Sequence, residues 1–194
     1  MALEDTRDKI VSVATKLFSR FGFHKTSMDE IAKIARKAKG SLYYHFASKE
    51  DLFREVVLQE IQTIKNGLLT VLYNQELTPP EKIKTYLSKR LSFIANAVNY
   101  QSTLTVDFIE HYDFIEDIKQ DYLKWDGSNI KKVFAEGIEQ QYFEKTDNLD
   151  VLISVFMLVI KGLEVPLFEQ KKYQELLPHF DSMLNIMIKG ISKT

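Results

Sequence analysis

The residues with the clearest chemistry in this chain are five basic side chains within one short segment. Lys33, Arg36, Lys37, Lys39 and Lys49 lie between positions 31 and 49, and no acidic residue lies among them. Residues 1–49 carry ten Lys or Arg against five Asp or Glu, a net charge of +5, whereas residues 50–194 carry sixteen against twenty-two, a net charge of −6. A basic segment joined to an acidic remainder indicates that only the N-terminal part meets a polyanion.

A second group of polar side chains could bind a metal ion. Asp107, Glu110 and His111 have the three- and four-residue spacing of ligands on one helix face, but no second cluster completes a coordination shell. The sequence has no cysteine, no glycine-rich phosphate loop, no nucleophile elbow and no paired-carboxylate motif. We therefore expect no metal site, no cofactor and no enzymatic activity.

The basic segment lies on two short predicted helices joined by a tight turn. Ser27 and Glu30 form a capping box that begins the first of them. The second covers residues 38–45. Two short helices joined in this way form a helix-turn-helix, which presents its second helix to a groove of DNA. The predicted apolar face of the first helix consists of Ile31, Ile34 and Ala35.

Helical periodicity extends along the whole chain and predicts an all-α protein of about nine helices. The first helix, over residues 6–21, ends at Gly22. A long helix begins at Ser48, and another follows the strong start signal Thr78-Pro79-Pro80-Glu81. Two further helices end near residues 112 and 143. The apolar stripe of the first helix contains Ile10, Val13, Ala14, Leu17, Phe18 and Phe21.

The last two predicted helices, about 149–165 and 176–190, are apolar on nearly every side. Pro166 should kink or end the first of them. Helices of this kind need cover on two faces, so we expect them to pack on their own domain and on a second copy of the chain. The longest uninterrupted apolar run, residues 155–160, is too short to cross a bilayer, and the N-terminus has no signal core. We expect a cytoplasmic homodimer with no membrane partner.

The pattern of the N-terminal segment resembles the TetR family of bacterial transcriptional regulators. The resemblance covers about residues 6–57, and beyond it the likeness is architectural. It implies an N-terminal three-helix helix-turn-helix DNA-binding domain over residues 1–47 and a helical ligand-binding and dimerisation domain over residues 48–194. The matching positions are Ile10-x-x-x-Ala14-x-x-Leu17-Phe18, Gly22, Thr26-Ser27, Ile31-Ala32, Leu42-Tyr43-x-x-Phe46 and Ser48-Lys49-Glu50-x-Leu52.

The resemblance places the recognition helix at residues 38–45. Lysine can donate to guanine, and Gly40 lets the backbone come close to the bases. The residues expected at the base edges are Lys39, Gly40, Ser41 and Tyr44. Those expected at phosphates or beside the groove are Thr26, Ser27, Arg36, Lys37, Tyr43, His45 and Lys49.

Two positions depart from the usual family pattern. Arg36 stands in the turn where relatives usually have glycine, so a bulky side chain must adopt the turn without glycine's freedom. Ala38 stands where a capping Ser or Thr is usual, and loss of such a cap costs about 1 kcal/mol of helix stability.

The resemblance also implies an effector pocket among the aromatic residues between positions 93 and 134. A large, mostly apolar cavity there would suit a small hydrophobic or aromatic ligand, although each aromatic side chain taken singly is better explained as part of the core. Asp107, Glu110 and His111 could orient such a ligand. The candidate lining residues are Phe93, Phe108, His111, Tyr112, Tyr122, Trp125 and Phe134.

Two functions remain open. The first is a homodimeric repressor that a small-molecule effector releases from a palindromic operator in double-stranded DNA. In this mechanism the effector shifts the helix that begins at Ser48, and the shift changes the spacing of the two recognition helices. The second is a DNA-binding regulator whose C-terminal domain only dimerises or binds a protein, with no small-molecule ligand.

Overall fold

The computed structural model of the chain describes residues 2–169 and 173–192. Within them it contains ten helices and no strand, apart from one isolated antiparallel bridge between Phe143 and Ser192. The helices are α1 (Ala2–Lys25), α2 (Met28–Ala35), α3 (Lys39–His45), α4 (Lys49–Leu72), α5 (Pro79–Asn96), α6 (Val98–Ser102), α7 (Val106–His111), α8 (Glu116–Glu139), α9 (Leu149–Glu169) and α10 (Tyr173–Ile191). The all-α prediction is confirmed. One more helix forms than expected, because two short helices replace the single helix predicted to end near residue 112.

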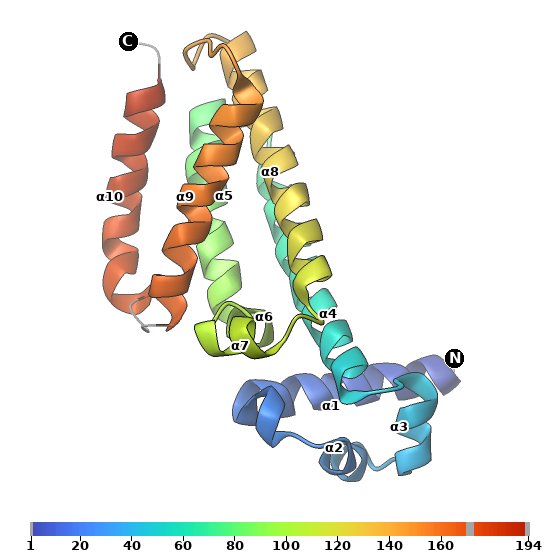
Figure 1. Cartoon of the computed structure of the whole chain (residues 1–194). Coiled ribbons are helices and arrows are strands. Elements are labelled where there is room, and N and C mark those ends of the chain that lie inside the picture. Colours follow the sequence, from blue (N-terminus) through green and yellow to red (C-terminus); the bar gives the residue numbers. More distant parts are fainter. Residues whose placement is uncertain (1, 170–172, 193–194) are drawn as a thin grey trace.

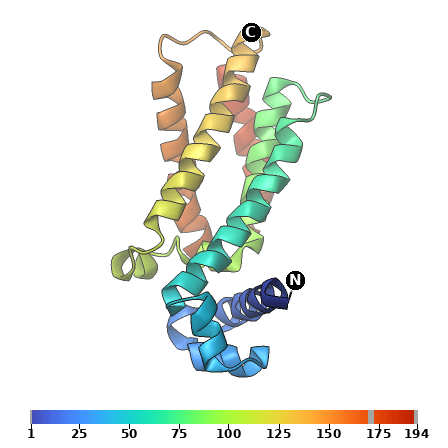
Figure 2. The same cartoon turned by 90° about the vertical axis from the view of Figure 1, so that its right-hand side faces the viewer.

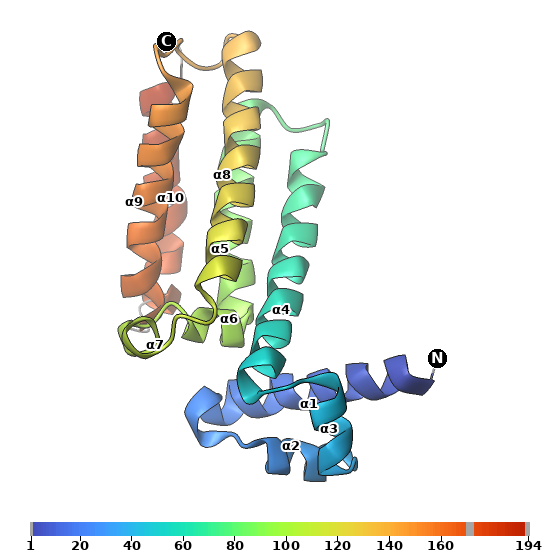
Figure 3. The ribbon, with the colours of Figure 1, turned by 45° about the vertical axis from the view of Figure 1, so that its right-hand side comes forward.

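The helices form two units that we call the head (α1–α3) and the body (α4–α10) (Figure 1). The N-terminal end of α4 packs on the head, and the rest of α4 runs along the body (Figure 3). α6 and α7 lie at the end of the body that faces the head, and the long body helices run away from the head (Figure 2). α9 and α10 form the edge of the body opposite α4.

The first helix changes direction at Gly22. Its backbone has φ 82° and ψ 163°, which side-chain-bearing residues rarely adopt, and the chain then makes one more short turn to Lys25. The predicted stop at Gly22 is therefore confirmed as a break in the helix. The predicted stripe is wrong at its last position, since Phe21 is 48% exposed and Val11 is buried instead.

The helix-turn-helix forms as predicted at its start and shows how Arg36 fits the turn. The Ser27 hydroxyl accepts from the backbone N–H of Glu30, and the Glu30 carboxylate accepts from the backbone N–H of Ser27, so the capping box is confirmed. Arg36 adopts the left-handed conformation, φ 56° and ψ 46°. This backbone ends α2 and lets Lys37 N–H donate to the carbonyl of Ala32 at 3.0 Å.

α3 lacks a side-chain cap, and α2 buries a different set of residues from the one predicted. α3 begins after Ala38, which as expected makes no side-chain cap. Ile34 was predicted to face the core but is 54% exposed. Met28 and Ala32 are buried with Ile31 and Ala35 instead. These four residues form the face of α2 that lies inside the head.

The start signals of α4 and α5 are also confirmed. The Ser48 hydroxyl accepts from the Asp51 backbone N–H, and the Glu81 carboxylate accepts from the backbone N–H and the hydroxyl of Thr78. α8 ends at Glu139, short of the predicted end near residue 143, and the chain folds back so that Phe143 lies on Gly137. A Cβ at Gly137 would stand 2.2 Å from the Phe143 ring, so this close approach requires glycine.

α9 and α10 carry large apolar side chains that the described part of the chain leaves uncovered. α9 continues through Pro166 to Glu169, so the proline does not end the helix. The segment Leu149–Phe168 is, by length and composition, apolar enough to cross a membrane, with a mean hydropathy of 2.1 and 29% of it buried. The uninterrupted run of residues 155–160 is part of this longer apolar helix, in which Ser154 and Lys161 flank the run. The expectation of no membrane partner stays a prediction. The exposed apolar residues here are Val151, Leu152, Val155, Leu158, Val159, Leu176 and Ile186.

Candidate nucleic-acid interface and body core

The outer surface of α3 carries the side chains expected to meet DNA. Tyr44 is 73% exposed, Tyr43 is about half exposed, and Lys39 and Gly40 lie on the surface of the first turn. Only Leu42 of this helix is fully buried, and it anchors α3 to the head. Ser41 and His45 are partly buried at the sides of the helix. α3 is thus anchored to the head by one apolar side chain, and its polar side is exposed.

Lys39 does not lie free on this surface. Its ammonium group pairs with the Asp29 carboxylate at 2.8 Å, and this interaction raises the pKa of Lys39. Asp29 belongs to the first turn of α2, so the pair joins the two helices of the motif. A DNA base or phosphate that binds Lys39 must compete with Asp29.

A polar hollow of about 360 Å³ lies between α1, α2, α3 and the start of α4. Lys49 enters it with its ammonium group held 3.0 Å from the Phe23 carbonyl and 4.2 Å from the centre of the Phe23 ring. The N-terminus of α2, at Ser27, also opens into the hollow, and helix N-termini attract anions. Ammonium groups, hydroxyls and a helix N-terminus together suit a phosphate group. The lining residues are His24, Lys25, Thr26, Ser27, Met28, Asp29, Lys39, Tyr43 and Lys49.

Hydrogen bonds within the head engage two of the predicted phosphate contacts, Thr26 and Lys37. Thr26 is only 3% exposed, and its hydroxyl donates to the carbonyl of Gly22 at 2.9 Å, so this side chain holds the bend in α1 instead of facing DNA. The Lys37 ammonium donates to the hydroxyl of Thr6 at 2.9 Å. Arg36 is exposed beside the turn.

The predicted effector residues fall into several separate groups in the structure. Phe108 and Tyr112 pack with Phe23, Phe53 and Phe114, with ring centres 4.8–6.2 Å apart. The other candidates lie elsewhere. Phe93 packs against Gly67, and Phe134 packs against Phe143 and Phe156. Trp125 stacks on Tyr122, and His111 lies on the surface. Asp107 and Glu110 are exposed too. The effector pocket stays a prediction, because helical periodicity cannot tell which turn of one helix meets which turn of another.

The cluster around Phe108 instead joins the body to the head, and we call it the clasp. Its residues come from four parts of the chain: Phe23 and His24 of α1, Phe53 and Arg54 of α4, Phe108 and Tyr112 from the α7 region, and, around the start of α8, Phe114 just before the helix and Asp117 in its first turn. The Tyr112 hydroxyl lies within hydrogen-bond distance of the His24 ring, and Arg54 donates to both oxygens of Asp117 at 2.6 Å.

The centre of the body contains a buried ion cluster that the sequence analysis missed. Arg90 of α5 is 1% exposed and donates from Nε to Asp126 of α8 at 2.6 Å and from Nη1 to Glu164 of α9. The Tyr86 hydroxyl donates to the other Asp126 oxygen at 2.5 Å. Burial raises the pKa of Glu164 and of Tyr86. The available signal was a charged residue inside an apolar stripe, such as Arg90 between Leu87 and Leu91.

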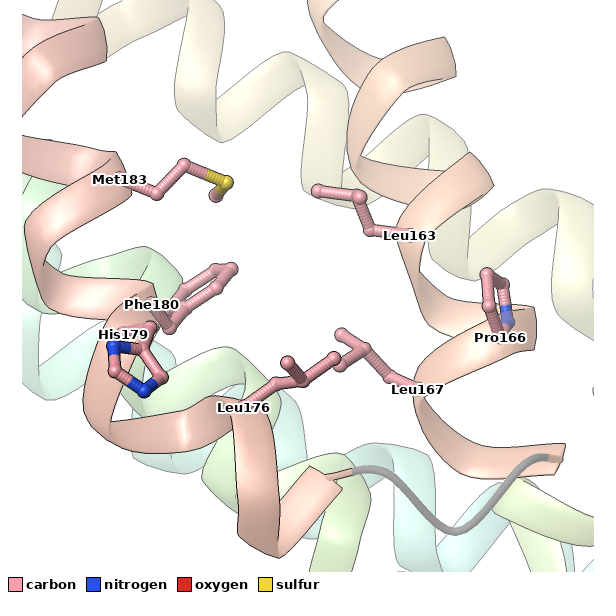
Figure 4. A pocket seen from close by; sticks show the side chains of 7 residues that line it. All are labelled: Leu163, Pro166, Leu167, Leu176, His179, Phe180 and Met183. Carbon is pink, nitrogen blue, oxygen red and sulfur yellow. The ribbon is translucent and has the colours of Figure 1, made fainter.

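A separate apolar cavity lies between α9 and α10 (Figure 4). Its volume is about 300 Å³, and almost all of its wall is carbon. None of the residues predicted for the effector pocket lines it. The lining residues are Leu163, Pro166, Leu167, Leu176, His179, Phe180 and Met183. Within residues 2–169 and 173–192, no group of three His, Asp or Glu side chains lies close enough together to hold a metal ion.

Comparison with known proteins agrees with the geometry of the head. Residues 10–56 match the family model described as bacterial regulatory proteins, tetR family. The chain is 27% identical to the fatty acid metabolism regulator protein of Bacillus subtilis over 94% of both chains. It is 47% identical to the transcriptional regulator QacR of Staphylococcus aureus over 51 residues, about a quarter of each chain.

The fold of the whole chain also has solved counterparts. A putative transcriptional regulator from Saccharomonospora viridis, crystallised in complex with choline, superimposes with a TM-score of 0.78 at 20% identity, over 98% of this chain and all of that one. At this identity the likeness concerns the fold alone.

A helix-turn-helix head with an exposed polar recognition helix, joined to an all-helical body, defines a DNA-binding transcriptional regulator. Transcriptional regulators of this kind are not enzymes. The head sequence, the fold and the relatives agree on one family, and the chain belongs to the TetR family of transcriptional regulators. Proteins of this family bind operator DNA and are typically homodimers.

Proposed function

We propose that this protein is a homodimeric repressor that leaves a palindromic operator when a small hydrophobic effector binds to its body. The observation that carries the proposal is the likeness to the Bacillus subtilis fatty acid metabolism regulator, because it extends over 94% of both chains and so includes the body. The apolar chemistry of the body supports the same class of effector. We further propose that residues 1–47 form the DNA-binding domain, that residues 48–194 form the effector and dimerisation domain, and that the protein acts in the cytoplasm.

For the DNA contacts we propose a division of roles along the head. Lys39, Gly40, Ser41 and Tyr44 face base edges in the major groove, where side-chain donors and close backbone approach can distinguish base pairs. A second set contacts or approaches the phosphates and fixes the register without reading sequence. These residues are Ser27, Arg36, Lys37, Tyr43, His45 and Lys49.

The dimer contact that we propose uses α9 and α10. These helices lie on the edge of the body opposite α4 (Figure 3), they carry uncovered apolar side chains, and an apolar cavity of about 300 Å³ lies between them. A second copy can bury the same face, which gives a two-fold symmetric interface. The two heads then lie on the same side of the dimer and can bind two half-sites of one operator.

The test measures binding of the purified protein to DNA from upstream of its own gene. We expect salt-sensitive binding to a palindrome, and release when straight-chain fatty acids or their methyl esters are added. Absence of any preference for a palindrome would reject the operator function. Operator binding that no such compound weakens would favour the second function, in which the body only dimerises or binds a protein. The close packing of the predicted pocket aromatics is the observation that keeps this second function in view.

A further inference from the structure

His24 is shared by the polar hollow of the head and the clasp. It follows the break in α1 at Gly22, its side chain is exposed, and it lines the hollow together with Ser27 and Lys49. The hydroxyl of Tyr112, a residue of the body, lies 2.8 Å from its Nδ1 and 2.7 Å from its Nε2. A side chain of the body therefore holds a side chain that opens toward the DNA-binding surface.

An imidazole at this place can bind a DNA phosphate. Its protonated form is a cation that donates from both ring nitrogens. The hollow already offers ammonium groups and the N-terminus of α2, which suit a phosphate. A phosphate in the hollow supplies the negative charge that favours the protonated ring. Since an imidazole ordinarily gains its proton below about pH 6.5, a phosphate contact through His24 makes DNA binding depend on pH.

The Tyr112 hydroxyl suits this imidazole in either protonation state. A hydroxyl can donate to a neutral ring nitrogen and can accept from a protonated one. It bonds to one of the two nitrogens at a time and leaves the other for a phosphate. The Tyr112 ring packs on Phe23 and Phe108, with ring centres 5.2 and 4.8 Å apart, so the clasp fixes the position of the hydroxyl.

The charged groups near this contact differ between its two sides. On the side of the hollow they are mostly cationic, and the one carboxylate among them, Asp29, is already paired with Lys39. The hollow is therefore basic by itself, and His24 adds to its charge only when protonated. The titratable groups that line the hollow with His24 are Lys25, Asp29, Lys39, Tyr43 and Lys49, and those beside Tyr112 are Glu50, Asp107 and His111.

We propose that His24 is a further phosphate contact and that Tyr112 of the body is its positioning residue. The proposal rests on the phosphate contacts proposed above for Ser27 and Lys49, and it adds a side chain whose charge changes with pH. It also connects the body directly to the DNA interface. A shift of the α7 region that withdraws the Tyr112 hydroxyl releases the His24 ring.

The experiment measures the affinity of the full chain for two duplexes of equal length, the operator palindrome and an unrelated sequence. Each is measured between about pH 6 and pH 8 and at several salt concentrations. The test variants are His24→Gln, which cannot gain a proton, Tyr112→Phe, which removes only the hydroxyl, and the double variant. The matched control is Tyr142→Phe, because Tyr142 is an exposed tyrosine that follows the end of α8.

We expect the wild type to bind both duplexes more tightly as the pH falls, because a phosphate contact does not read sequence. At about pH 6, His24→Gln should bind up to about fivefold less tightly for each head, with a salt dependence shallower by about 0.9 for each head. At about pH 8 it should bind nearly as the wild type does. His45, another proposed phosphate contact, remains in every protein, so the difference between the profiles isolates His24.

Tyr112→Phe should change the pH profile in the same direction as His24→Gln. The double variant should match His24→Gln, because the Tyr112 hydroxyl acts through the His24 ring. Tyr142→Phe should keep the wild-type profile. A loss of stability alone would weaken binding equally at every pH, so the profile separates positioning from a purely structural role.

A wild-type pH profile in His24→Gln would overturn the phosphate contact, and a wild-type profile in Tyr112→Phe would overturn its positioning role. An effect of His24→Gln on the palindrome alone would also overturn the proposal, since it would indicate a base contact. Calorimetry of the wild type in two buffers of different ionisation enthalpy tests the contact without any variant. Binding at about pH 6.5 without proton uptake would reject it. In each case, a retained preference for the palindrome shows that the operator function itself still stands.

Discussion

Gly40 is a residue that the fold does not require. A Cβ at this position would meet no atom within 4 Å, and its backbone is ordinary helix. Gly137 differs, because there a Cβ would collide with the Phe143 ring. Packing within the folded chain therefore gives no reason for glycine at position 40, whereas the close approach of DNA bases that we propose for the first turn of α3 would use it.

We expect Gly40→Ala to weaken operator binding while raising the free energy of unfolding by about 0.5–1 kcal/mol, since alanine favours helix. Fluorescence anisotropy with labelled operator and thermal unfolding measure the two effects. Lys33→Ala, on the exposed side of α2, serves as the control and should leave operator affinity nearly unchanged. Unchanged affinity in Gly40→Ala would remove position 40 from the proposed interface.

The pair between Lys39 and Asp29 leads to a second prediction at the scale of single residues. Asp29→Asn frees the Lys39 ammonium and removes a negative charge beside the groove. We expect up to about fivefold tighter operator binding and a steeper dependence on salt. Asp121→Asn removes the same charge from the body and should have little effect. Weaker binding by Asp29→Asn would mean that Asp29 positions Lys39 for DNA instead of competing for it.

Among the helices, the clasp is one of the contacts that hold the head against the body, beside the packing of α1 on α4 and α6. It joins the end of α1 and the start of α4 to the region from α7 to the first turn of α8. Lys49, a proposed phosphate contact, bonds to the carbonyl of Phe23, whose ring lies in the same cluster. A movement of α8 in the body can therefore change the position of a side chain in the DNA interface.

The ion pair of the clasp predicts a pH dependence. Arg54 lowers the pKa of Asp117 to about 2, below its value of roughly 3.9 in unfolded chains. The pair therefore stabilises the fold above pH ~4, and this contribution is lost as the pH falls through about 2. Since Asp117 is well exposed, we expect Asp117→Asn to cost about 0.5–1 kcal/mol at neutral pH.

Chemical denaturation of wild type and Asp117→Asn at several pH values tests this. The difference in unfolding free energy should shrink as the pH is lowered below about 4. Asp121→Asn, on the same helix, loses only a 3.7 Å contact with Lys124 and should show a smaller difference throughout. A difference between wild type and Asp117→Asn that stayed constant across this range would show that Arg54 and Asp117 do not pair in solution.

At the scale of the whole molecule, a single chain does not cover its own apolar surface. Leu158 is 70% exposed on α9, and its neighbours on the same face are also uncovered. A surface of this extent marks an interface in a protein that is otherwise well packed. The buried pairing of Glu164 with Arg90 shows that the other side of α9 belongs to the interior of the body.

We expect Leu158→Glu to give a monomer with an intact head, because a carboxylate would be buried at the proposed dimer contact. Analytical ultracentrifugation measures the oligomeric state. Operator affinity should fall by about 10²–10⁴, since the two heads no longer bind together. Tyr73→Glu, equally exposed at the end of α4, should remain dimeric. A dimer in Leu158→Glu would place the contact elsewhere.

Local signals were sufficient for the sequence to determine the helices and the family. The caps at Ser27, Ser48 and Thr78 and the break at Gly22 act through backbone hydrogen bonds and φ preferences within a few residues, so they can be read without knowing the fold. The fixed spacings of the head, which match over residues 10–56, identify the family.

Only the tertiary structure decided which faces meet. Ile34 and Phe21 fit an apolar stripe but lie on the surface, and Thr26 is buried where a surface hydroxyl was expected. The aromatic residues of the body divide between a clasp and several core contacts, and Arg90, Asp126 and Glu164 meet from three helices. Periodicity fixes the direction of a side chain relative to its own helix. The rotation and height of each helix against its neighbours depend on packing between distant segments, which no local pattern contains.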